Sequence, residues 1–332
     1  MARYVKISTF TINPIPEAEI NKDISLYESV KCYLDRQLKN VLADKPDLIV
    51  LPEHCGRQVS FPERKQEYCE WGSLYLFDYF KSVAKENKCY IAFSRYKKME
   101  DGTVRNCASV IGRDGEVVGE YHKNYPTVYE TEAGILAGRD VPVIECDFGT
   151  ICPIICFDLN FDDIRKKVKD RKPDIVTFHS AFHGGLMQEF FAYDTRSYLV
   201  SSLLNIRRSK ILSPMGVTVA TTTTYTNWVT ATINLDYAVC HIDYNWAKFV
   251  KAKEKYGNKL KIDDPDDVGA VMLSYEGEDK TVMDIISEFE IELLDEYIER
   301  SIKNREENIE ELKADIWKEK HIWKNYYRYY LF

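Results

Sequence analysis

The sequence predicts a mixed α/β fold in which two layers of helix enclose mixed β-sheets. Strand-like and helix-like patterns alternate over the first 120 residues and again in the second half of the chain. Short, wholly apolar runs such as Leu48-Ile49-Val50-Leu51 fit strands that are buried on both faces. With 332 residues, of which 45% are apolar and 30% charged, the chain can bury a large core without disulfide staples.

Apolar spacing and turn residues place the elements of the first half. Leucine and valine recur at helical intervals from Leu26 to Leu42, and Pro46 ends that helix. The dipeptide Asp114-Gly115 indicates a β-hairpin turn. Strands are expected at residues 5–10, 48–51, 89–93, 108–111 and 116–121, and helices at residues 26–42 and 76–84.

The second half repeats this alternation. Phe148-Gly149 joins two strands, and Pro214-Met215-Gly216 forms a turn before a region rich in serine, threonine and valine. Strands are expected at residues 142–146, 150–155 and 174–178 and within 217–235, and helices at residues 162–169 and 186–199.

The composition changes after about Phe249, which predicts a main domain over residues 1–250 and a C-terminal extension over residues 251–332. Residues 284–311 hold 11 acidic and 3 basic residues, a net charge of −8 that equals that of the whole chain. An apolar stripe within this acidic stretch indicates a helix. The aromatic tail that follows is expected to dock on the body or on a partner subunit.

Charge, cysteine usage and hydropathy exclude several protein classes. The acidic balance argues against a nucleic-acid-binding protein. No stretch approaches the ~20 apolar residues that span a bilayer, and Met1-Ala2-Arg3-Tyr4-Val5-Lys6 lacks the apolar core of a secretion signal. Nine scattered cysteines then indicate reduced thiols in a cytoplasmic protein.

Three segments place a reactive side chain at or just beyond the end of a predicted strand. Glu53 follows the first buried run, Lys123 ends the hairpin, and Cys156 ends the run Ile151-Cys152-Pro153-Ile154-Ile155. Ligands of open α/β sheets bind at the carboxyl ends of strands, so these side chains are expected to converge.

A carboxylate, an ammonium and a thiol together can perform acyl transfer. Cys156 would attack a carbonyl or nitrile carbon and form a thioester, because a deprotonated thiol is a strong nucleophile. Glu53, desolvated at the strand ends, would have a raised pKa and act as the base. Lys123 and a backbone N–H after the nucleophile would stabilise the oxyanion, and a helix beginning at Asp158 would favour the thiolate.

These residues lie in motifs that resemble those of a known family. The matching segments are Leu48-Ile49-Val50-Leu51-Pro52-Glu53, Gly119-Glu120-Tyr121-His122-Lys123 and Ile155-Cys156-Phe157-Asp158-Leu159-Asn160-Phe161. Their order and spacing are similar to the Glu, Lys and Cys motifs of the nitrilase (carbon–nitrogen hydrolase) superfamily, and the resemblance covers roughly residues 4–240. It implies an α-β-β-α sandwich, a Glu–Lys–Cys triad, no cofactor, and homodimers or larger homo-oligomers.

The resemblance also implies a second glutamate between the Lys and Cys motifs, which helps to position substrate. Glu130 fits the spacing best, with Glu132 as the alternative. Phe157-Asp158 after the cysteine is more similar to the amidase and N-carbamoyl-hydrolase branches than to true nitrilases, although Phe161-Asp162-Asp163 departs from the usual sequel. The implied reaction releases ammonia from a small linear carboxamide or N-carbamoyl compound, with the Phe157 N–H in the oxyanion hole.

Alternative hypotheses involve the segment that follows the predicted strand at residues 174–178. His179, Ser180, Ala181 and His183 are expected to bind substrate or line its pocket, and a hydrolase pairing Cys156 with His179 or His183 is one rival. Nitrile hydrolysis, an acyl or amide transferase and a catalytically silent scaffold are the others. A metal site is not expected, because Cys152 and Cys156 lie four residues apart on a strand, roughly 13 Å, too far for one zinc ion.

Overall fold

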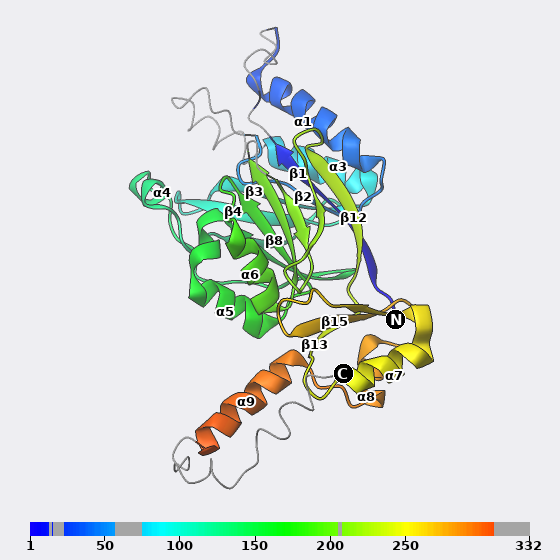
Figure 1. Cartoon of the computed structure of the whole chain (residues 1–332). Helices are drawn as coiled ribbons and strands as arrows, with labels where there is room; N and C mark the ends of the chain where they lie inside the picture. The colour runs from blue at the N-terminus through cyan, green and yellow to red at the C-terminus, as the bar shows by residue number, and fades with distance from the viewer. Residues whose placement is uncertain (13–14, 16–22, 57–74, 205–207, 309–332) are drawn as a thin grey trace.

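The computed structural model describes residues 1–12, 15, 23–56, 75–204 and 208–308 (Figure 1). The helices of this part of the chain are α1 (Leu26–Leu42), α3 (Phe77–Asn87), α4 (Val128–Glu132), α5 (Asp162–Arg171), α6 (Leu186–Thr195), α7 (Trp246–Tyr256), α8 (Val282–Glu288), α9 (Leu294–Asn308) and the short 3-10 helices η4 (Cys156–Asn160) and η5 (Gly257–Lys259). Among these described helices, none combines the length and apolarity needed to cross a membrane.

The strands of the main body form two halves that meet along one strand. The first half is β1 (Tyr4–Ile12), β2 (Leu48–Val50), β3 (Tyr90–Lys98), β4 (Val104–Ile111), β5 (Val117–His122) and β12 (Trp228–Asn234). The second half is β6 (Ile144–Cys146), β7 (Gly149–Ile155), β8 (Ile175–Ser180), β9 (Tyr198–Leu204), β10 (Lys210–Leu212) and β11 (Thr218–Thr221). The end of β1 pairs with β9 and connects the halves.

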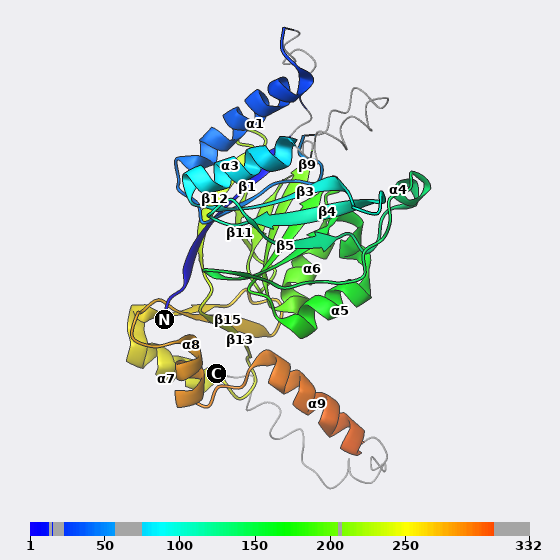
Figure 2. The same ribbon diagram turned by 180° about the vertical axis from the view of Figure 1, so that it is seen from behind.

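Three apolar clusters define the layers. One cluster holds the inner faces of α1 and α3 against β1–β3, and another holds α5 and α6 against β7–β9. The third lies between the two strand groups. Figures 1 and 2 show the two helix pairs on opposite sides of the strands. The predicted α-β-β-α sandwich is therefore confirmed.

The alternation along β1 shows how the sequence builds these layers. Phe10 and Ile12 face the helix-side cluster, whereas Val5 and Ile7 face the cluster between the strand groups. Successive strand residues point to opposite faces of the sheet. A strand whose two faces are both apolar therefore lies between two buried layers.

The predicted helix over residues 186–199 is too long. Helix α6 ends at Thr195, because Arg196 adopts a left-handed conformation (φ 56°) that closes the helix. The chain then enters β9, which lies between β1 and β8 and is wholly buried. The polar residues Ser201 and Ser202 interrupt its apolar pattern, so the sequence did not predict this strand.

The C-terminal part adds a second, small sheet of β13 (Tyr237–His241), β15 (Ala270–Tyr275) and β14 (Leu260–Asp263), covered by α7 and α8. The boundary predicted at residue 250 falls within α7, and the division into domains stays a prediction. The acidic stretch forms two helices rather than one, with Glu290 in a left-handed conformation between α8 and α9. The aromatic tail lies outside the described residues.

Strand direction brings the candidate residues to one edge. β1, β2 and β3 are parallel to one another, and β5 runs the same way because β4 is antiparallel to both of its neighbours. β7, β8 and β9 are parallel, and β9 is parallel to β1. The carboxyl ends of β2, β5, β7 and β8 therefore share one edge of the body.

Candidate active site

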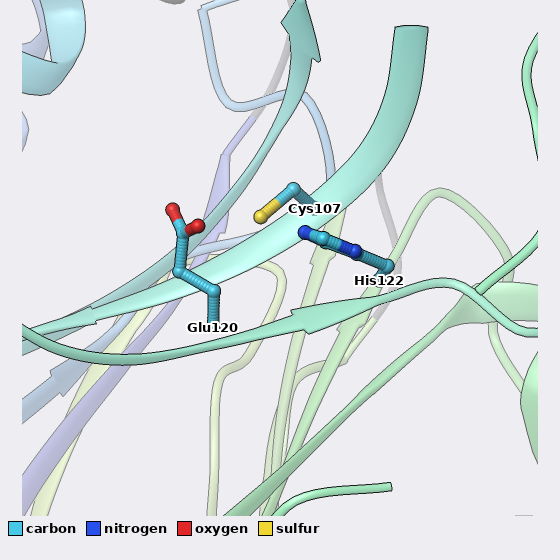
Figure 3. Close-up of side chains that lie close together, drawn as sticks. All are labelled: Cys107, Glu120 and His122. Carbon is cyan, nitrogen blue, oxygen red and sulfur yellow. The ribbon is translucent and has the colours of Figure 1, made fainter. Parts of the chain in front are cut away.

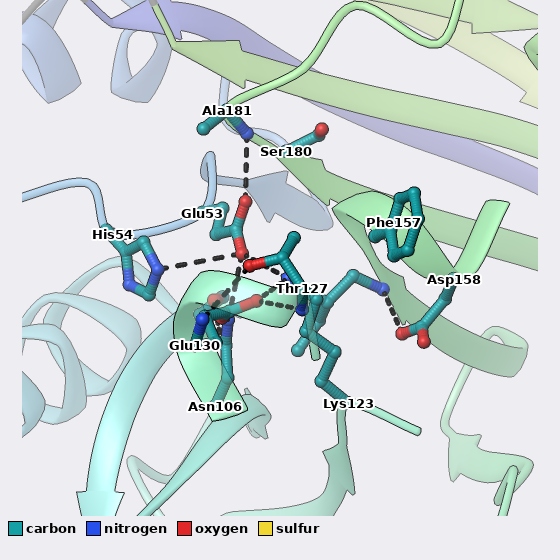
Figure 4. Close-up of polar contacts among 12 residues, drawn as sticks. Glu53, His54, Asn106, Lys123, Thr127, Glu130, Phe157, Asp158, Ser180 and Ala181 are labelled. Carbon is teal, nitrogen blue, oxygen red and sulfur yellow. Dashed lines mark hydrogen bonds and ion pairs between the residues drawn. The ribbon is translucent and has the colours of Figure 1, made fainter. Parts of the chain in front are cut away.

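Four candidate side chains meet at this edge, and Figure 4 labels three of them, Glu53, Lys123 and Glu130. Glu53 follows β2, Lys123 follows β5, Glu130 lies in α4, and Cys156 begins η4 directly after β7. Their exposed fractions are 2%, 1%, 5% and 8%. Burial at this level strengthens every charge interaction among them, since little water screens it.

Glu53 is held by groups from three other segments. Its Oε1 accepts hydrogen bonds from Asn106 Nδ2 (2.8 Å) and Lys123 Nζ (3.1 Å), and its Oε2 accepts one from the Ala181 N–H (3.0 Å). Burial acts to raise the pKa of Glu53, but the electrostatic effects of Lys123 and His54 and the hydrogen bonds from the Ala181 N–H and Cys156 outweigh it and lower the pKa to about 2. The raised pKa expected from the sequence is wrong, because the neighbouring donors stabilise the carboxylate.

Lys123 bridges two carboxylates. Its ammonium donates to Glu53 and also to Glu130 Oε2 (2.8 Å). Burial alone would lower the pKa of Lys123, yet Glu53, Cys156 and Glu130 together raise it above its ordinary value. An ammonium has three N–H donors, and side chains of the described residues use two of them, which leaves one for a ligand.

Glu130 is fixed at the start of α4. Its Oε2 accepts a hydrogen bond from the Thr127 N–H (2.8 Å), and the Thr127 hydroxyl accepts one from the Glu130 N–H, which forms a capping box. Burial works against the charged form, but Lys123 lowers the pKa of Glu130 below its ordinary value. Glu132 is exposed, so Glu130 is the glutamate that reaches the site.

Asn106 joins the two carboxylates and was missed in the sequence. Its Nδ2 donates to Glu53 and to Glu130 Oε1 (2.9 Å), and its Oδ1 accepts a hydrogen bond from Ser94 Oγ (3.1 Å). An amide between two carboxylates supplies N–H donors without adding charge. It lies within β4, far along the chain from each predicted motif, and nothing local marks it.

Cys156 adopts a left-handed backbone conformation (φ 48°) at the turn from β7 into η4. Non-glycine residues rarely adopt this conformation, and it is concentrated at functional sites. Burial and the Glu53 charge raise the pKa of the Cys156 thiol to about 12, although Lys123 and a hydrogen bond with Ser180 act to lower it. The thiolate expected at a helix N-terminus is therefore wrong for the resting site. The thiol keeps its proton and donates a hydrogen bond to Glu53.

Asp158 fixes the turn that carries Cys156. Its carboxylate accepts hydrogen bonds from Tyr121 Oη (2.7 Å), the Tyr125 N–H (2.8 Å) and the Ile155 N–H (3.2 Å). Burial raises the pKa of Asp158 to about 6 despite these bonds. This contact ties the turn after β7 to the segment around Lys123, a role that its place two residues after the cysteine could have suggested.

The arrangement combines a nucleophile, an adjacent base and a cation. The residues Glu53, His54 and Glu130 also bring three metal-ligating groups within 4.8 Å of one another. The ammonium of Lys123 already bonds both carboxylates, so the chain supplies the positive charge here from its own side chain.

Comparison with known proteins agrees with this geometry. The family model for carbon-nitrogen hydrolases matches residues 25–239. The chain belongs to the carbon-nitrogen hydrolase family. The predicted membership of the nitrilase (carbon–nitrogen hydrolase) superfamily is confirmed, and its amidase-like branch stays a prediction.

Curated relatives of this carbon-nitrogen hydrolase are distant in sequence. It is 20% identical to omega-amidase NIT2 of Xenopus tropicalis over 262 residues, which cover 71% of this chain and 91% of that protein. It is 27% identical to the probable hydrolase YhcX of Bacillus subtilis over 165 residues, 45% of this chain but 32% of that one. The match therefore spans about a third of YhcX.

Solved structures share the fold. An amidase from Nesterenkonia sp. superposes with a TM-score of 0.60 at 14% identity, covering 69% of this chain and 90% of that one. A Glu-to-Gln mutant of the Nesterenkonia sp. AN1 amidase superposes with a TM-score of 0.59 at 13% identity, covering 76% and 96%. That structure shows covalent addition of the acetamide moiety of fluoroacetamide at the active-site cysteine.

The predicted pocket residues of this family member divide into two groups. His179 is wholly buried, and its ring nitrogens contact Leu51 O (2.6 Å) and Thr177 Oγ1 (3.0 Å). Burial lowers the pKa of His179 to about 4, so the ring is neutral. The expectation that His179 faces substrate is wrong, and so is its pairing with Cys156 as a base. It instead holds the end of β2, two residues before Glu53.

The other four residues surround the site in different ways. Ser180 is buried beside Cys156, and the Ala181 N–H is used on Glu53. Phe157 is 40% exposed next to the nucleophile, and its ring packs edge-on against Phe161. His183 is exposed and stacks near Phe182, without a polar contact to Glu53, Lys123 or Cys156 among the described residues. Its place in a substrate pocket stays a prediction.

Proposed function

We propose that this carbon-nitrogen hydrolase cleaves the C–N bond of a small, neutral carboxamide or N-carbamoyl compound through a thioester on Cys156. The observation that carries the proposal is the ionised carboxylate of Glu53, held by Asn106, Lys123 and Ala181 against the protonated thiol of Cys156. A base fixed beside a nucleophile is the arrangement that covalent catalysis needs.

In the first half-reaction, the Cys156 sulfur attacks the carbonyl carbon while Glu53 takes the thiol proton. The free N–H of the Lys123 ammonium and the backbone N–H of Phe157 stabilise the oxyanion. The C–N bond then breaks, Glu53 returns the proton to the departing nitrogen, and ammonia leaves. The acyl group remains on sulfur as a thioester.

In the second half-reaction, Glu53 takes a proton from water, and the resulting hydroxide attacks the thioester carbon. The C–S bond breaks, the sulfur recovers its proton, and the carboxylic acid is released. The sum is R–CO–NH₂ plus water giving R–COOH plus ammonia. These steps use water and groups of the chain itself, and Glu130 acts by holding Lys123 in place.

The local charge favours an uncharged substrate. The His54 ring lies 3.6 Å from Glu53 Oε1. The three groups Glu53, Glu130 and Lys123 together form a buried cluster with two negative charges and one positive charge. An anionic group placed beside it would be repelled, and the low local dielectric would make the cost large. An amide carbonyl brings no charge until the transition state forms.

The relatives support this proposal from two directions. One relative is named an omega-amidase, and a solved relative is described with its active-site cysteine modified by an amide reagent. Location in a cytoplasm and assembly into homo-oligomers stay predictions.

A substrate panel tests the proposal. Purified protein is incubated with short linear carboxamides, N-carbamoyl amines and the matching nitriles, and ammonia and carbon dioxide are measured separately. Ammonia alone from carboxamides supports amide hydrolysis, and carbon dioxide beside ammonia indicates a carbamoyl substrate. Turnover of nitriles alone, or of nothing in the panel, contradicts the proposal and favours a nitrile hydrolase or a silent scaffold.

A further inference from the structure

A second cluster of reactive side chains lies on the helix-side face of β4 and β5. Cys107, Glu120 and His122 each offer one ligand atom, and these atoms all lie within 4.8 Å of one another (Figure 3). None of the three belongs to the machinery proposed above. A thiol, a carboxylate and an imidazole are the ligand types that zinc takes in proteins.

The strand register explains why the three side chains meet. Cys107 on β4 is the direct partner of His122 on β5, and Ser109 is the partner of Glu120. Residues two apart on one strand share a face, so Glu120 and His122 project to the same side as Cys107. The backbone itself therefore gathers the ligands, with no loop involved.

Two of the three groups lack a strong partner. The Nε2 atom of His122 is buried and has no hydrogen-bond partner among the described residues. Cys107 is wholly buried, and its described hydrogen-bond contact is a weak one to Ser109 Oγ at 3.8 Å. A buried ring nitrogen without a partner is unfavourable, and a bound ion would satisfy it.

Glu120 is better satisfied but keeps room for a ligand. Its Oε1 accepts bonds from Ser109 Oγ (2.8 Å) and Arg95 (3.2 Å), and its Oε2 accepts one from Lys97. A carboxylate offers about four lone-pair sites, so one remains on Oε2. Lys97 is 31% exposed at its side chain and can turn toward water when a cation arrives.

We propose that Cys107, Glu120 and His122 form a binding site for a divalent transition-metal ion of the zinc class. Tetrahedral zinc with sulfur at about 2.3 Å and nitrogen at about 2.0 Å needs ligand atoms about 3.5 Å apart. Side-chain rotations that move these atoms by about 1 Å would bring them to that separation. Three protein ligands leave a fourth position for water.

The position of this site links it to the catalytic centre. Asn106 precedes Cys107 and Lys123 follows His122, and the Lys123 N–H donates to Asn106 O (2.9 Å). Neighbouring residues on a strand point to opposite faces, so an ion here would clamp the two strands directly behind Asn106 and Lys123. Metal binding should therefore raise the temperature of unfolding, as any ligand of the native state does.

Cobalt titration tests the proposal, since a thiolate bound to Co²⁺ gives a charge-transfer band in the near ultraviolet. The titration uses the full chain carrying Cys156→Ala, so that the candidate nucleophile cannot bind the ion. We expect a band that saturates at one Co²⁺ per chain and disappears on addition of Zn²⁺. Adding Cys107→Ser should abolish the band, and adding His122→Ala should weaken Co²⁺ affinity at least tenfold.

A matched control is Cys89→Ser, which removes another wholly buried thiol outside the cluster. This change should leave the band and the affinity intact. Circular dichroism verifies that each variant is folded, and if Cys107→Ser does not fold, His122→Ala and Glu120→Gln decide the matter. Absence of the band, or a band and affinity that survive the cluster substitutions, would overturn the proposal.

Discussion

The Lys123 ammonium lies 3.1 Å from the Glu53 carboxylate, and both side chains are almost wholly buried. This ion pair is the centre of the site, because Lys123 also binds Glu130 and Asn106 joins the two carboxylates from the other side. The pair keeps Glu53 charged without water, which lets a carboxylate serve as base beside a protonated thiol.

Replacing Lys123 by Met should both destabilise the protein and remove activity. The change leaves two carboxylates buried side by side, and breaking a buried pair in this way costs about 3–5 kcal/mol. Urea unfolding measures the free energy of unfolding. The matched control is Lys169→Met, which removes a half-exposed ion pair with Asp194 and should cost about 1 kcal/mol or less. Equal losses for the two variants would argue against a buried charge centre.

The stability that Glu53 contributes should depend on pH in acid. Its folded-state pKa of about 2 lies below the ordinary 4.5, so the contribution is present above pH 4.5 and is lost as the pH falls toward 2. The difference in unfolding free energy between the native chain and Glu53→Gln should shrink by about 3 kcal/mol across this window. A difference that instead shrinks as the pH rises above 4.5 would mean that the carboxyl has the raised pKa of a desolvated acid.

Asn106→Ala should lower kcat while leaving the protein folded. Without the amide, Glu53 and Glu130 lose their shared donor and move apart or toward Lys123, and a displacement of about 1 Å can cost 10²-fold in rate. Steady-state ammonia release measures this effect. Asn87→Ala, which removes a side-chain bond to Val83 O on α3, is the matched control and should leave kcat unchanged. An unchanged kcat for Asn106→Ala would remove this residue from the site.

The reactivity of Cys156 toward alkylating reagents should depend on charge. Iodoacetamide is neutral and resembles a substrate, whereas iodoacetate brings an anion close to the carboxylates of Glu53 and Glu130. We expect iodoacetamide to label Cys156 first and at least tenfold faster than iodoacetate, since one like charge at short range costs more than 1.4 kcal/mol. Peptide mass spectrometry identifies the labelled cysteine. Preferential labelling of the exposed Cys32 by both reagents would contradict an activated Cys156.

Local patterns were sufficient for the strands that end at the site. Glu53 and Cys156 follow apolar runs that fit buried strands, and strand direction then brings their ends together. The same reasoning failed for β9, because Ser201 and Ser202 interrupt the apolar pattern of a central strand. It failed also at Arg196, since no sequence signal marked the left-handed residue that ends α6.

The electrostatics of the site could not be predicted from the sequence. The pKa values of Glu53 and Cys156 depend on each other and on Lys123, and that of Glu53 depends also on the Ala181 N–H, and these groups come from distant segments. Predicting them requires the distances as well as the residue types. The sequence likewise could not decide between Glu130 and Glu132, because only the path of α4 shows which carboxylate faces inward.

The central claim is that Cys156 carries the acyl group, and acid-quenched mass spectrometry at steady state tests it most directly. With the most active carboxamide of the panel, we expect an acyl adduct on the Cys156 peptide that hydroxylamine removes. Cys156→Ala should lose both the adduct and ammonia release, whereas Cys152→Ala, at a buried cysteine of the preceding strand β7, should keep both. Full ammonia release by Cys156→Ala would contradict the account.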